Sequence, residues 1–156
     1  MSEKSRTQRI LAENRRARHD YEILEKIEAG LALLGSEVKS LRGGSGNIAE
    51  AYAQVADGEA WIVNMHIPEY LQAGPHQNHD PRRRRKLLMK AREVERVRKK
   101  VAEKGLTLVP LKLYFSGPWV KLEVGVCRGR KRHDKRHALK ERQDRRDVQR
   151  ALRHRD

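Results

Sequence analysis

The pattern of hydrophobic and polar positions divides most of the chain into short apolar segments of strand length, joined by turn signals. Residues 48–56 and 59–67 flank Asp57-Gly58, and an Asp-Gly pair between two such segments is the strongest short signal for a β-hairpin. Residues 106–115 and 119–127 flank a Ser-Gly-Pro turn in the same manner. The pattern therefore predicts two antiparallel hairpins.

Two further features predict where strands bend. Residues 20–34 carry β-branched and apolar residues around Gly30, which predicts one strand, or two strands with a bend at that glycine. In residues 106–115 the apolar positions change from one face to the other near Pro110, whereas they alternate cleanly after the turn. A β-bulge near Pro110 would reconcile the two faces, because proline cannot donate a hydrogen bond to a sheet.

Helix signals bound two segments. Residues 36–42 begin at Ser36, a suitable N-cap, and are followed by two glycines that end a helix. Asp80-Pro81 places a capping residue and a first-turn proline before an apolar stripe of helical spacing, and Gly105 follows that stripe. We therefore expect a short helix over 36–42 and a long helix over about 81–104.

These elements predict a mainly β fold with about six strands and two or three flanking helices. In a chain this short, hairpin connections close or nearly close the strands into a small antiparallel β-barrel. We assign residues 14–129 to this barrel domain and residues 1–13 to a mobile basic arm. Residues 130–156 contain few apolar residues, so we expect a basic tail that is disordered when free and helical when bound to a polyanion.

Charge narrows the class of partner. The 156 residues contain 36 Lys or Arg and 21 Asp or Glu, which gives a net charge of +15 at pH 7. Residues 82–104 carry +9 and residues 130–156 carry +7, which leaves the remainder about neutral. A surplus this concentrated favours a polyanion, with nucleic acid as the first candidate and an anionic membrane surface as the second.

The chain shows no signal typical of a membrane or secreted protein. No apolar stretch approaches the roughly 18 residues of a membrane span, and the first residues lack the hydrophobic segment of a secretory signal. The single cysteine, Cys127, excludes an intramolecular disulfide, so a cytoplasmic location fits best. Because Cys127 ends an apolar strand, we interpret it as a core residue rather than a nucleophile.

Several residue clusters suggest chemistry, and we favour the simpler interpretation of each. His66, His76 and His79 could hold a metal ion, but without a CxxC or HExxH motif they are better interpreted as polar residues of a loop. The glycine-rich segment 43–46 could suggest a phosphate loop, but no Lys-Ser/Thr follows it, so we interpret it as a helix stop and turn. We therefore expect no metal.

Other residues suggest contacts with RNA. His133 and Asp134 could form the acid–base pair of a ribonuclease, but a mobile segment lacks the rigid placement that catalysis needs. Glu28 lies in a strand-like segment, where a solvent-facing carboxylate is favoured over an acceptor for a nucleobase. No signature of a B-DNA reader is present. Most of the following aromatic residues are core candidates, and one or two could present a ring for base stacking: Tyr21, Tyr52, Trp61 and Trp119.

Segments along nearly the whole chain match one family. The most specific are Glu37-Val38-Lys39-Ser40-Leu41-Arg42 and His133-Asp134-Lys135-Arg136, in this order and spacing. The other matching segments are 14–21, 28–30, 35–36, 64–67, 80–81, 85–88, 105–114 and 129–132. On these residues the chain resembles the SsrA-binding proteins (small protein B) of bacteria, most strongly over residues 14–142.

The resemblance implies a fold and a function. The fold would be an oligonucleotide-binding-like (OB-like) antiparallel barrel with flanking helices. Members of the family bind transfer-messenger RNA (SsrA RNA) and deliver it to ribosomes stalled on messages without a usable stop codon, in trans-translation. The body would bind the tRNA-like domain of this RNA, and the tail would enter the small-subunit decoding centre and the empty message channel as a helix.

The same resemblance implies a set of partners and excludes others. The expected partners are transfer-messenger RNA, the ribosome and, through the aminoacylated RNA, elongation factor Tu. Neither a membrane nor a cofactor is expected, and the protein would not be an enzyme. A basic ribonuclease and a structural ribosomal protein are the alternative functions.

Residue by residue, the resemblance places Glu28 and Leu88 on the RNA-binding face. A carboxylate accepts hydrogen bonds and repels phosphate, so Glu28 suits a base edge or a 2′-hydroxyl. Lys90 stands where many members carry Asn or another polar residue, and a lysine would favour phosphate. At the end of the tail, Ala151-Leu152 lacks the larger apolar pair that some members have there. The implied RNA-binding residues are Arg15, Arg18, His19, Tyr21, Glu28, Lys39, Arg42, Arg85, Lys86, Leu88 and Lys90. The implied decoding-centre residues are Arg130, Lys131, His133, Asp134, Lys135 and Arg136, with His133 as the stacking residue.

Overall fold

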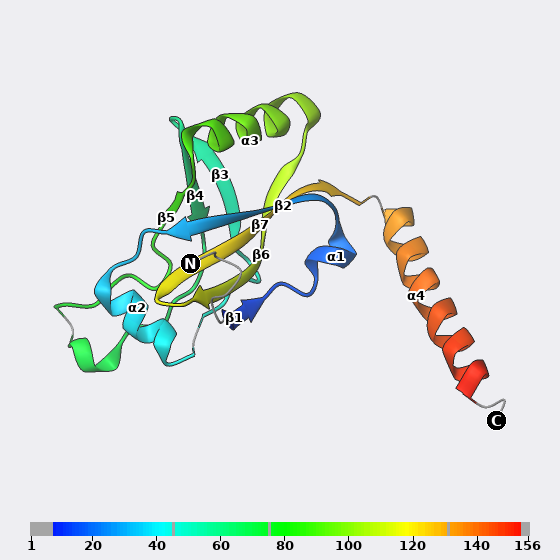
Figure 1. Cartoon of the computed structure of the whole chain (residues 1–156), viewed down its shortest axis with the longest axis horizontal. Helices are drawn as coiled ribbons and strands as arrows, with labels where there is room; N and C mark the ends of the chain where they lie inside the picture. Colours follow the sequence, from blue (N-terminus) through cyan, green and yellow to red (C-terminus); the bar gives the residue numbers. More distant parts are fainter. Residues whose placement is uncertain (1–7, 45, 75, 131, 154–156) are drawn as a thin grey trace.

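The structure is a computed structural model that describes residues 8–44, 46–74, 76–130 and 132–153 (Figure 1). Within these ranges the strands belong to one antiparallel sheet. They are β1 (Gln8–Glu13), β2 (Tyr21–Leu31), β3 (Tyr52–Ala56), β4 (Glu59–Val63), β5 (Arg85–Leu88), β6 (Thr107–Ser116) and β7 (Trp119–Gly129). The helices are α1 (Ala17–Asp20), α2 (Gly35–Arg42), α3 (Ala91–Lys104), α4 (Arg132–Arg153) and the 3₁₀ turn η2 (Leu71–Ala73). In the part of the chain covered by these ranges, no helix is long and apolar enough to cross a membrane.

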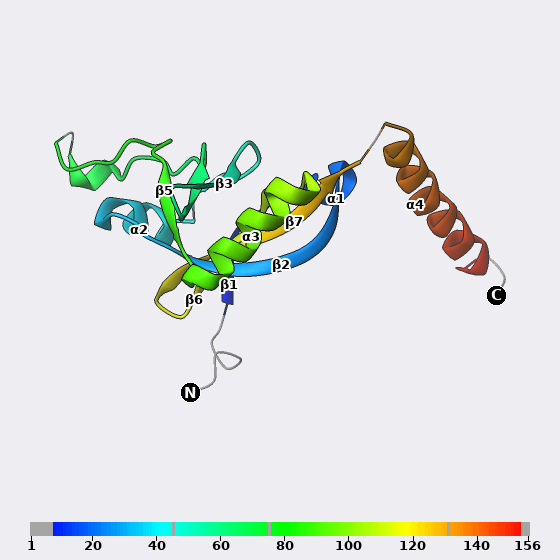
Figure 2. The same cartoon turned by 90° about the horizontal axis from the view of Figure 1, so that it is seen from above.

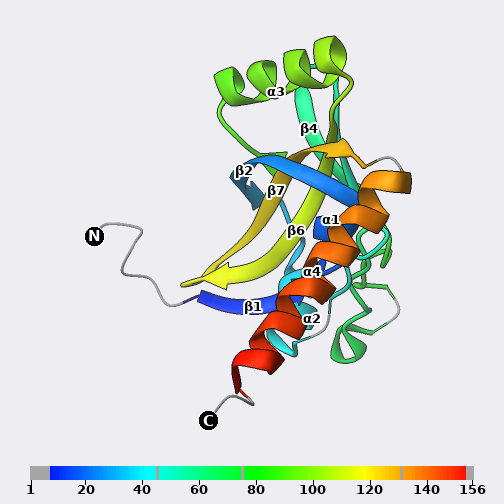
Figure 3. The same cartoon turned by 90° about the vertical axis from the view of Figure 1, so that its right-hand side faces the viewer.

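Six of the described strands close into a ring. Their order is β6-β3-β4-β5-β2-β7, and β7 pairs with β6 again. The long strand β6 allows this closure because the two halves of one edge have different neighbours. Its Leu108 pairs with Ala53 of β3. Its residues 112–116 pair with β1, which lies beside β6 in Figure 3. The expected antiparallel barrel is therefore confirmed, with β1 as an additional strand.

The interior of the barrel is filled by alternate residues of its strands. Ile62, Leu113 and Leu122 face inward and are fully buried. Helix α3 lies at one end of the barrel (Figure 1), where Val94 and Val97 join the same apolar core. The apolar stripe that precedes Gly105 in the sequence is therefore the face of α3 that packs against the barrel.

Two local turn predictions are confirmed. Asp57 (φ 53°) and Gly58 (φ 76°) form the left-handed turn between β3 and β4. The register of β6 against β7 shifts between Pro110 and Lys112, so Leu111 is the extra residue of the predicted bulge. The expected cap of the short helix is different, because α2 begins at Gly35 and its cap residue is Leu34.

The long helix expected over 81–104 is present only in its second half. Helix α3 begins at Ala91 and ends at Lys104, where the left-handed Gly105 (φ 61°) follows it as predicted. The segment before it forms β5, which pairs with both β4 and β2 and completes the ring. Asp80 caps a turn rather than a helix, because its Oδ1 accepts a hydrogen bond from the N–H of Arg82 at 2.9 Å. The capping signal is local, whereas the strand is required by closure of the barrel.

The mobile arm predicted for residues 1–13 is wrong for residues 8–13. These residues form β1, which pairs with β6, while residues 1–7 lie outside the described residues. The register of β1 shifts between Ile10 and Ala12. Such an irregularity removes the strict alternation by which a strand is recognised in a sequence.

The basic tail forms helix α4, which stands clear of the barrel in Figure 2. The side chains described in this helix, at residues 140 and 142–153, are exposed. A helix is the conformation that we expected of the tail when it is bound. Its disorder in the free protein remains a prediction.

Candidate nucleic-acid interface

Glu28 lies on the outer face of the barrel, in the middle of β2. Its Oε2 accepts a hydrogen bond from the hydroxyl of Tyr114 on β6, and Lys121 Nζ on β7 lies 3.1 Å from its Oε1. The Tyr114 hydrogen bond, together with Lys121, lowers the pKa of Glu28 against the opposing effect of burial. The carboxylate is therefore ionised at neutral pH and held in place, while 41% of the side chain remains exposed.

An exposed apolar residue lies beside this carboxylate. Leu88 of β5 pairs in register with Gly30 of β2, two residues from Glu28, and is 52% exposed. A Cβ atom at Gly30 would lie 3.3 Å from the Leu88 Cβ, so glycine permits the close approach of the two strands. The result is a fixed acceptor next to an apolar surface, which suits the edge and face of a nucleobase.

A polar cleft of about 330 Å³ occupies the adjacent surface between β2, β6 and the turn that carries α1. It is lined by Arg15, Arg18, Lys26 and Lys112, together with Glu13, Asn14, Ile23, Leu111 and Glu123. The predominance of basic groups around its rim suits phosphate. The cleft brings Arg15 and Arg18, which are far from β6 in sequence, to the same surface as the strands.

The turn carrying these arginines is anchored by the β6 bulge. Asn14 donates from its backbone N–H to the Leu111 carbonyl at 2.9 Å and from its side chain to the Pro110 carbonyl at 3.1 Å. Ala17 is buried against a small cluster outside the barrel that includes Val109 and Cys127. These contacts hold the turn in place and leave Arg15 and Arg18 exposed.

A family model described as SmpB protein matches residues 11–154. The chain belongs to the SmpB family. Among SmpB relatives, the SsrA-binding protein of Microcystis aeruginosa is 55% identical over 144 residues, which cover 92% of this chain and 94% of that protein. The SsrA-binding protein of Gloeothece citriformis is 51% identical over 152 residues, which cover 97% and 98% of the two chains.

An SmpB chain of known structure is also similar. That structure is described as "tmRNA-SmpB: a journey to the center of the bacterial ribosome" and matches with a TM-score of 0.64 and 49% sequence identity. The match covers 82% of this chain and 93% of that chain. The barrel architecture described above is therefore shared with a solved SmpB structure.

One residue expected at the interface of this SmpB barrel is buried instead. Arg85 is 0% exposed and its Nε donates to Oε2 of Glu37, which is also fully buried. Its Nη1 donates to the Met65 carbonyl at 2.6 Å, and Arg83 Nη2 donates to the other Glu37 oxygen at 2.6 Å. Arg85 therefore joins α2 to β5 and cannot contact RNA. The sequence pattern missed this role because its partner is 48 residues away.

Four other predicted residues of the SmpB fold do not line the cleft that holds Arg15 and Arg18. Lys39 Nζ lies 5.8 Å from the centre of the Tyr70 ring, and Arg42 lines a different cleft with Phe115. Lys86 pairs with Glu59 at 3.0 Å. Lys90 is exposed at the start of α3. The structure therefore does not gather the predicted cations into one patch.

Two predicted residues close to α1 have structural contacts. His19 Nδ1 lies 3.0 Å from Asp20 Oδ1. Tyr21 is half-buried against the cluster outside the barrel. Two residues that contact Glu28 were not predicted. They are Tyr114, whose phenol donates a hydrogen bond, and the cation Lys121. Their outward positions in β6 and β7 follow from alternation, but their proximity to Glu28 depends on strand pairing.

The aromatic and histidine predictions have mixed outcomes. Trp119 and Tyr52 are 59% and 49% exposed, while Tyr21 and Trp61 are half-buried. Two of the four rings are therefore exposed, as the prediction allowed, and none of the four is fully buried. His79 is buried, with Nδ1 2.9 Å from Ser36 Oγ and Nε2 2.9 Å from the Ile67 carbonyl, so both ring nitrogens have protein partners. No group of metal-binding side chains occurs in the ranges that the structure describes.

The structure also describes Cys127 and most of the glycine-rich segment 43–46. Cys127 is fully buried, which confirms its assignment to the core, and burial raises its pKa to about 11. Gly43 and Gly44 follow α2 as the predicted helix stop, while residue 45 lies outside the described residues.

The tail residues that the resemblance implies begin at the end of β7. The backbone N–H of Arg130 donates to the Asp20 carbonyl at 3.0 Å, which ties the start of the tail to α1. Lys131 lies outside the described residues. His133, Asp134, Lys135 and Arg136 belong to the first turns of α4, and their side chains also lie outside the described part.

Proposed function

We propose that this chain is an RNA-binding adaptor that binds the tRNA-like domain of transfer-messenger RNA and delivers it to stalled ribosomes. The observation that carries the proposal is the Glu28 carboxylate, ionised and fixed on an exposed face beside Leu88. Membership of the SmpB family supports it, as do the names of the relatives, which are SsrA-binding proteins.

The Glu28 face divides recognition between two kinds of contact. Glu28 accepts a hydrogen bond from a base edge or a 2′-hydroxyl, while Leu88 packs against an apolar surface. Arg15, Arg18 and Lys26 at the neighbouring cleft bind phosphate oxygens. The phosphate contacts supply affinity, and the acidic residue supplies discrimination, because it rejects a misplaced phosphate.

The tail has a separate role in this proposal. Residues 130–156 enter the decoding centre and the empty message channel of the small ribosomal subunit, with contacts from Arg130 to Arg136. Elongation factor Tu is reached through the aminoacylated RNA rather than by a direct contact. The protein itself forms or breaks no covalent bond, and its site of action is the ribosome in the bacterial cytoplasm.

A mobility-shift experiment with full-length protein tests the proposal. Transfer-messenger RNA and a transfer RNA of unrelated sequence are compared as ligands at physiological salt, since non-specific phosphate contacts weaken as salt rises. We expect a salt-resistant complex with transfer-messenger RNA alone. Equal affinity for both RNAs would contradict the proposal, and cleavage of the RNA would favour the ribonuclease alternative.

A further inference from the structure

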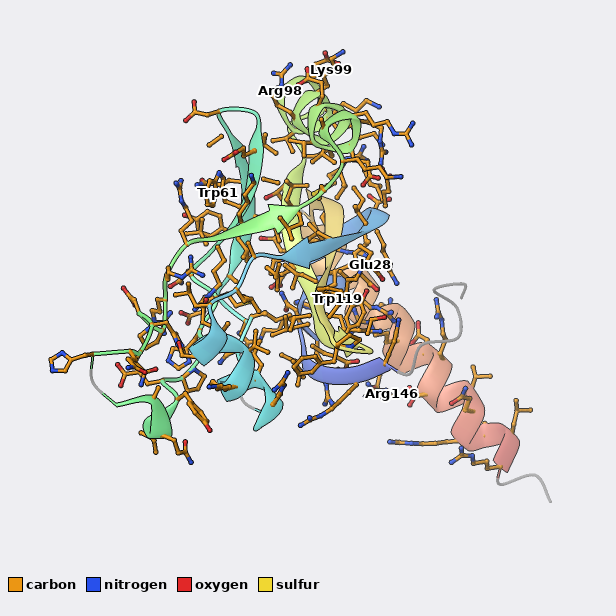
Figure 4. The ribbon with its side chains drawn as sticks, turned by 60° about the vertical axis from the view of Figure 1, so that its left-hand side comes forward. Glu28, Trp61, Arg98, Lys99, Trp119 and Arg146 are labelled. Carbon is orange, nitrogen blue, oxygen red and sulfur yellow. The ribbon has the colours of Figure 1, made fainter. Side chains whose placement is uncertain are left out.

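We propose that the outer face of β3, β4 and β5 binds an unpaired segment of RNA, separately from the Glu28 face. The inference rests on the proposed function only in taking RNA as the ligand. Figure 4 shows Trp61 on this face, well apart from Glu28 and toward a different side of the barrel. Two aromatic rings, a stacked arginine and an adjoining polar cleft carry the inference.

The two aromatic rings are neighbours on one side of the sheet. Trp61 of β4 pairs with Gln54 of β3, and Tyr52 pairs with Val63, so Tyr52 and Trp61 are diagonal neighbours on the same face. Tyr52 is 49% exposed and Trp61 is half-buried, whereas Ile62, between Trp61 and Val63, is fully buried in the core. Aromatic rings on a sheet face stack unpaired bases with little regard to sequence.

The Trp61 ring also supports a second flat surface. The guanidinium carbon of Arg84 lies 4.0 Å from the centre of the ring, and Arg84 is exposed. At this distance the guanidinium lies over the ring, and because Arg84 is exposed it remains open to a further contact. RNA bases stack on arginine planes as they do on aromatic rings. Trp61 and Arg84 therefore form one stacking platform.

A cation adjoins this platform. Lys86 of β5 pairs in register with Trp61, so it projects from the same face. Its Nζ contacts Glu59 at 3.0 Å, with both side chains more than 40% exposed. An exposed pair of this kind contributes little to stability, so a phosphate oxygen can replace the carboxylate at small cost.

The platform leads to a polar cleft of about 320 Å³ at the end of β4. Asn47, Glu50, Asn64, His66 and Arg82 line this cleft. Asn64 has a left-handed backbone (φ 63°), and its Oδ1 accepts a hydrogen bond from Arg82 Nη1 at 2.8 Å. This contact holds the guanidinium at the cleft, where its remaining N–H groups can bind a phosphate or an unstacked nucleotide.

Fluorescence of Trp61 gives a direct test. The chain contains two tryptophans, so Trp119→Phe leaves Trp61 as the single reporter. We expect decauridylate, an unstructured RNA, to quench this fluorescence saturably at low salt. With a labelled decauridylate, Trp61→Ala and Arg84→Ala should each weaken binding about tenfold, the scale of one stacking contact. Affinity for the isolated tRNA-like domain should stay within twofold.

Controls separate this inference from the proposed function. Glu28→Ala should weaken binding of the tRNA-like domain and leave decauridylate binding unchanged. Circular dichroism melting shows whether Trp61→Ala is folded, and Arg84→Ala tests the same platform with an exposed residue. An absence of quenching, or unchanged decauridylate affinity in the Arg84→Ala variant, would overturn the inference. If Glu28→Ala has no effect on the tRNA-like domain, the proposed function fails instead.

Two ligands then identify the source of the unpaired segment. A weaker complex between Arg84→Ala and full-length transfer-messenger RNA places the segment in that RNA, outside its tRNA-like domain. A loss of affinity confined to vacant small ribosomal subunits places it in ribosomal RNA. If Arg84→Ala binds both as tightly as the unaltered protein does, the face has no RNA ligand in this process and the inference is wrong.

Discussion

Tyr114 on β6 donates its hydroxyl hydrogen bond to Glu28 on β2, across the intervening strand β7. Tyr114 is 3% exposed, whereas Glu28 reaches solvent. A buried phenol therefore fixes an exposed carboxylate. Lys121 of β7 completes the arrangement at 3.1 Å from the other carboxylate oxygen. Because the closed barrel sets the spacing of the three strands, the acceptor has one orientation before RNA binds.

Replacement of Glu28 should weaken RNA binding, although the loss of its negative charge alone predicts the opposite. Removal of a negative group would strengthen binding if only long-range charge mattered. We expect Glu28→Ala instead to lose about 1–3 kcal/mol of binding free energy for transfer-messenger RNA, the scale of a charged hydrogen bond. Glu22→Ala is the matched control, because Glu22 is an exposed glutamate of the same strand, paired with Arg128 at 3.6 Å. Equal affinities of the two variants would contradict the role of Glu28.

Removal of the Tyr114 hydroxyl should separate orientation from charge. In Tyr114→Phe the carboxylate keeps Lys121 but loses the hydrogen bond that lowers its pKa most. We expect a higher Glu28 pKa, measured by NMR titration, and RNA affinity between those of the unaltered protein and Glu28→Ala. An unchanged Glu28 pKa would show that the hydroxyl does not hold the carboxylate in solution.

The buried pair of Glu37 and Arg85 should contribute to stability rather than to RNA affinity. Glu37→Gln leaves the fully buried Arg85 guanidinium without its carboxylate, which we expect to cost about 3–5 kcal/mol of unfolding free energy. Urea unfolding measures this loss. Glu59→Gln breaks the exposed pair with Lys86 and should cost less than about 1 kcal/mol. A similar small cost for Glu37→Gln would mean that the buried pair is replaceable.

The same buried pair should make the stability of the folded protein depend on pH in the acid range. Burial alone would raise the pKa of Glu37, but hydrogen bonds from Arg83, the Leu34 N–H and Arg85 outweigh it and lower the pKa below 4.5. A carboxyl whose folded pKa is lowered stabilises the protein above its unfolded pKa, and this contribution declines as pH falls through the folded pKa. Below pH 4.5 the unaltered protein should therefore lose stability more steeply than Glu37→Gln does.

Truncation after Gly129 should divide RNA binding from ribosome function. The body retains Glu28, Leu88 and the basic cleft, so affinity for transfer-messenger RNA should remain nearly intact. Tagging of nascent chains on stalled ribosomes should be lost, because the proposed decoding-centre contacts are absent. If RNA binding disappears with the tail, the tail is a primary RNA contact and the proposed division is wrong.

The free tail should show little helix in isolation. Circular dichroism of a peptide of residues 130–156 measures this, since its few apolar residues leave the helix without a packed face. Addition of RNA should raise the helix content by neutralising like charges. A peptide that is already helical alone at low salt would show that α4 needs no partner.

The local features of the fold were predictable because neighbouring residues determine them. The Asp57-Gly58 hairpin, the bulge beside Pro110 and the end of α3 at Gly105 depend on backbone conformations that a few adjacent residues select. The family resemblance added Glu28 as a candidate for RNA contact.

A sequence pattern cannot predict which charged side chains pair with each other in the folded protein. Residues 82–104 look like one basic surface, yet many of their cations have acidic partners elsewhere in the structure. Arg83 and Arg85 pair with Glu37, and Arg96 and Lys100 pair with Glu25. Within the segment itself, Arg98, which points away from the barrel near Lys99 in Figure 4, pairs with Glu95 of the same helix. The tertiary structure therefore leaves a smaller basic surface than the net charge suggests.

By itself the sequence determined the hairpins, the β-rich class and a basic, RNA-directed character. Only the tertiary structure decided that Arg85 is buried, that residues 8–13 and 85–88 are strands, and that Tyr114 and Lys121 hold Glu28. The physical reason is the range of the interactions. Turns and caps form between adjacent residues, whereas barrel closure and the partners of Glu28 depend on strands that are distant in the chain.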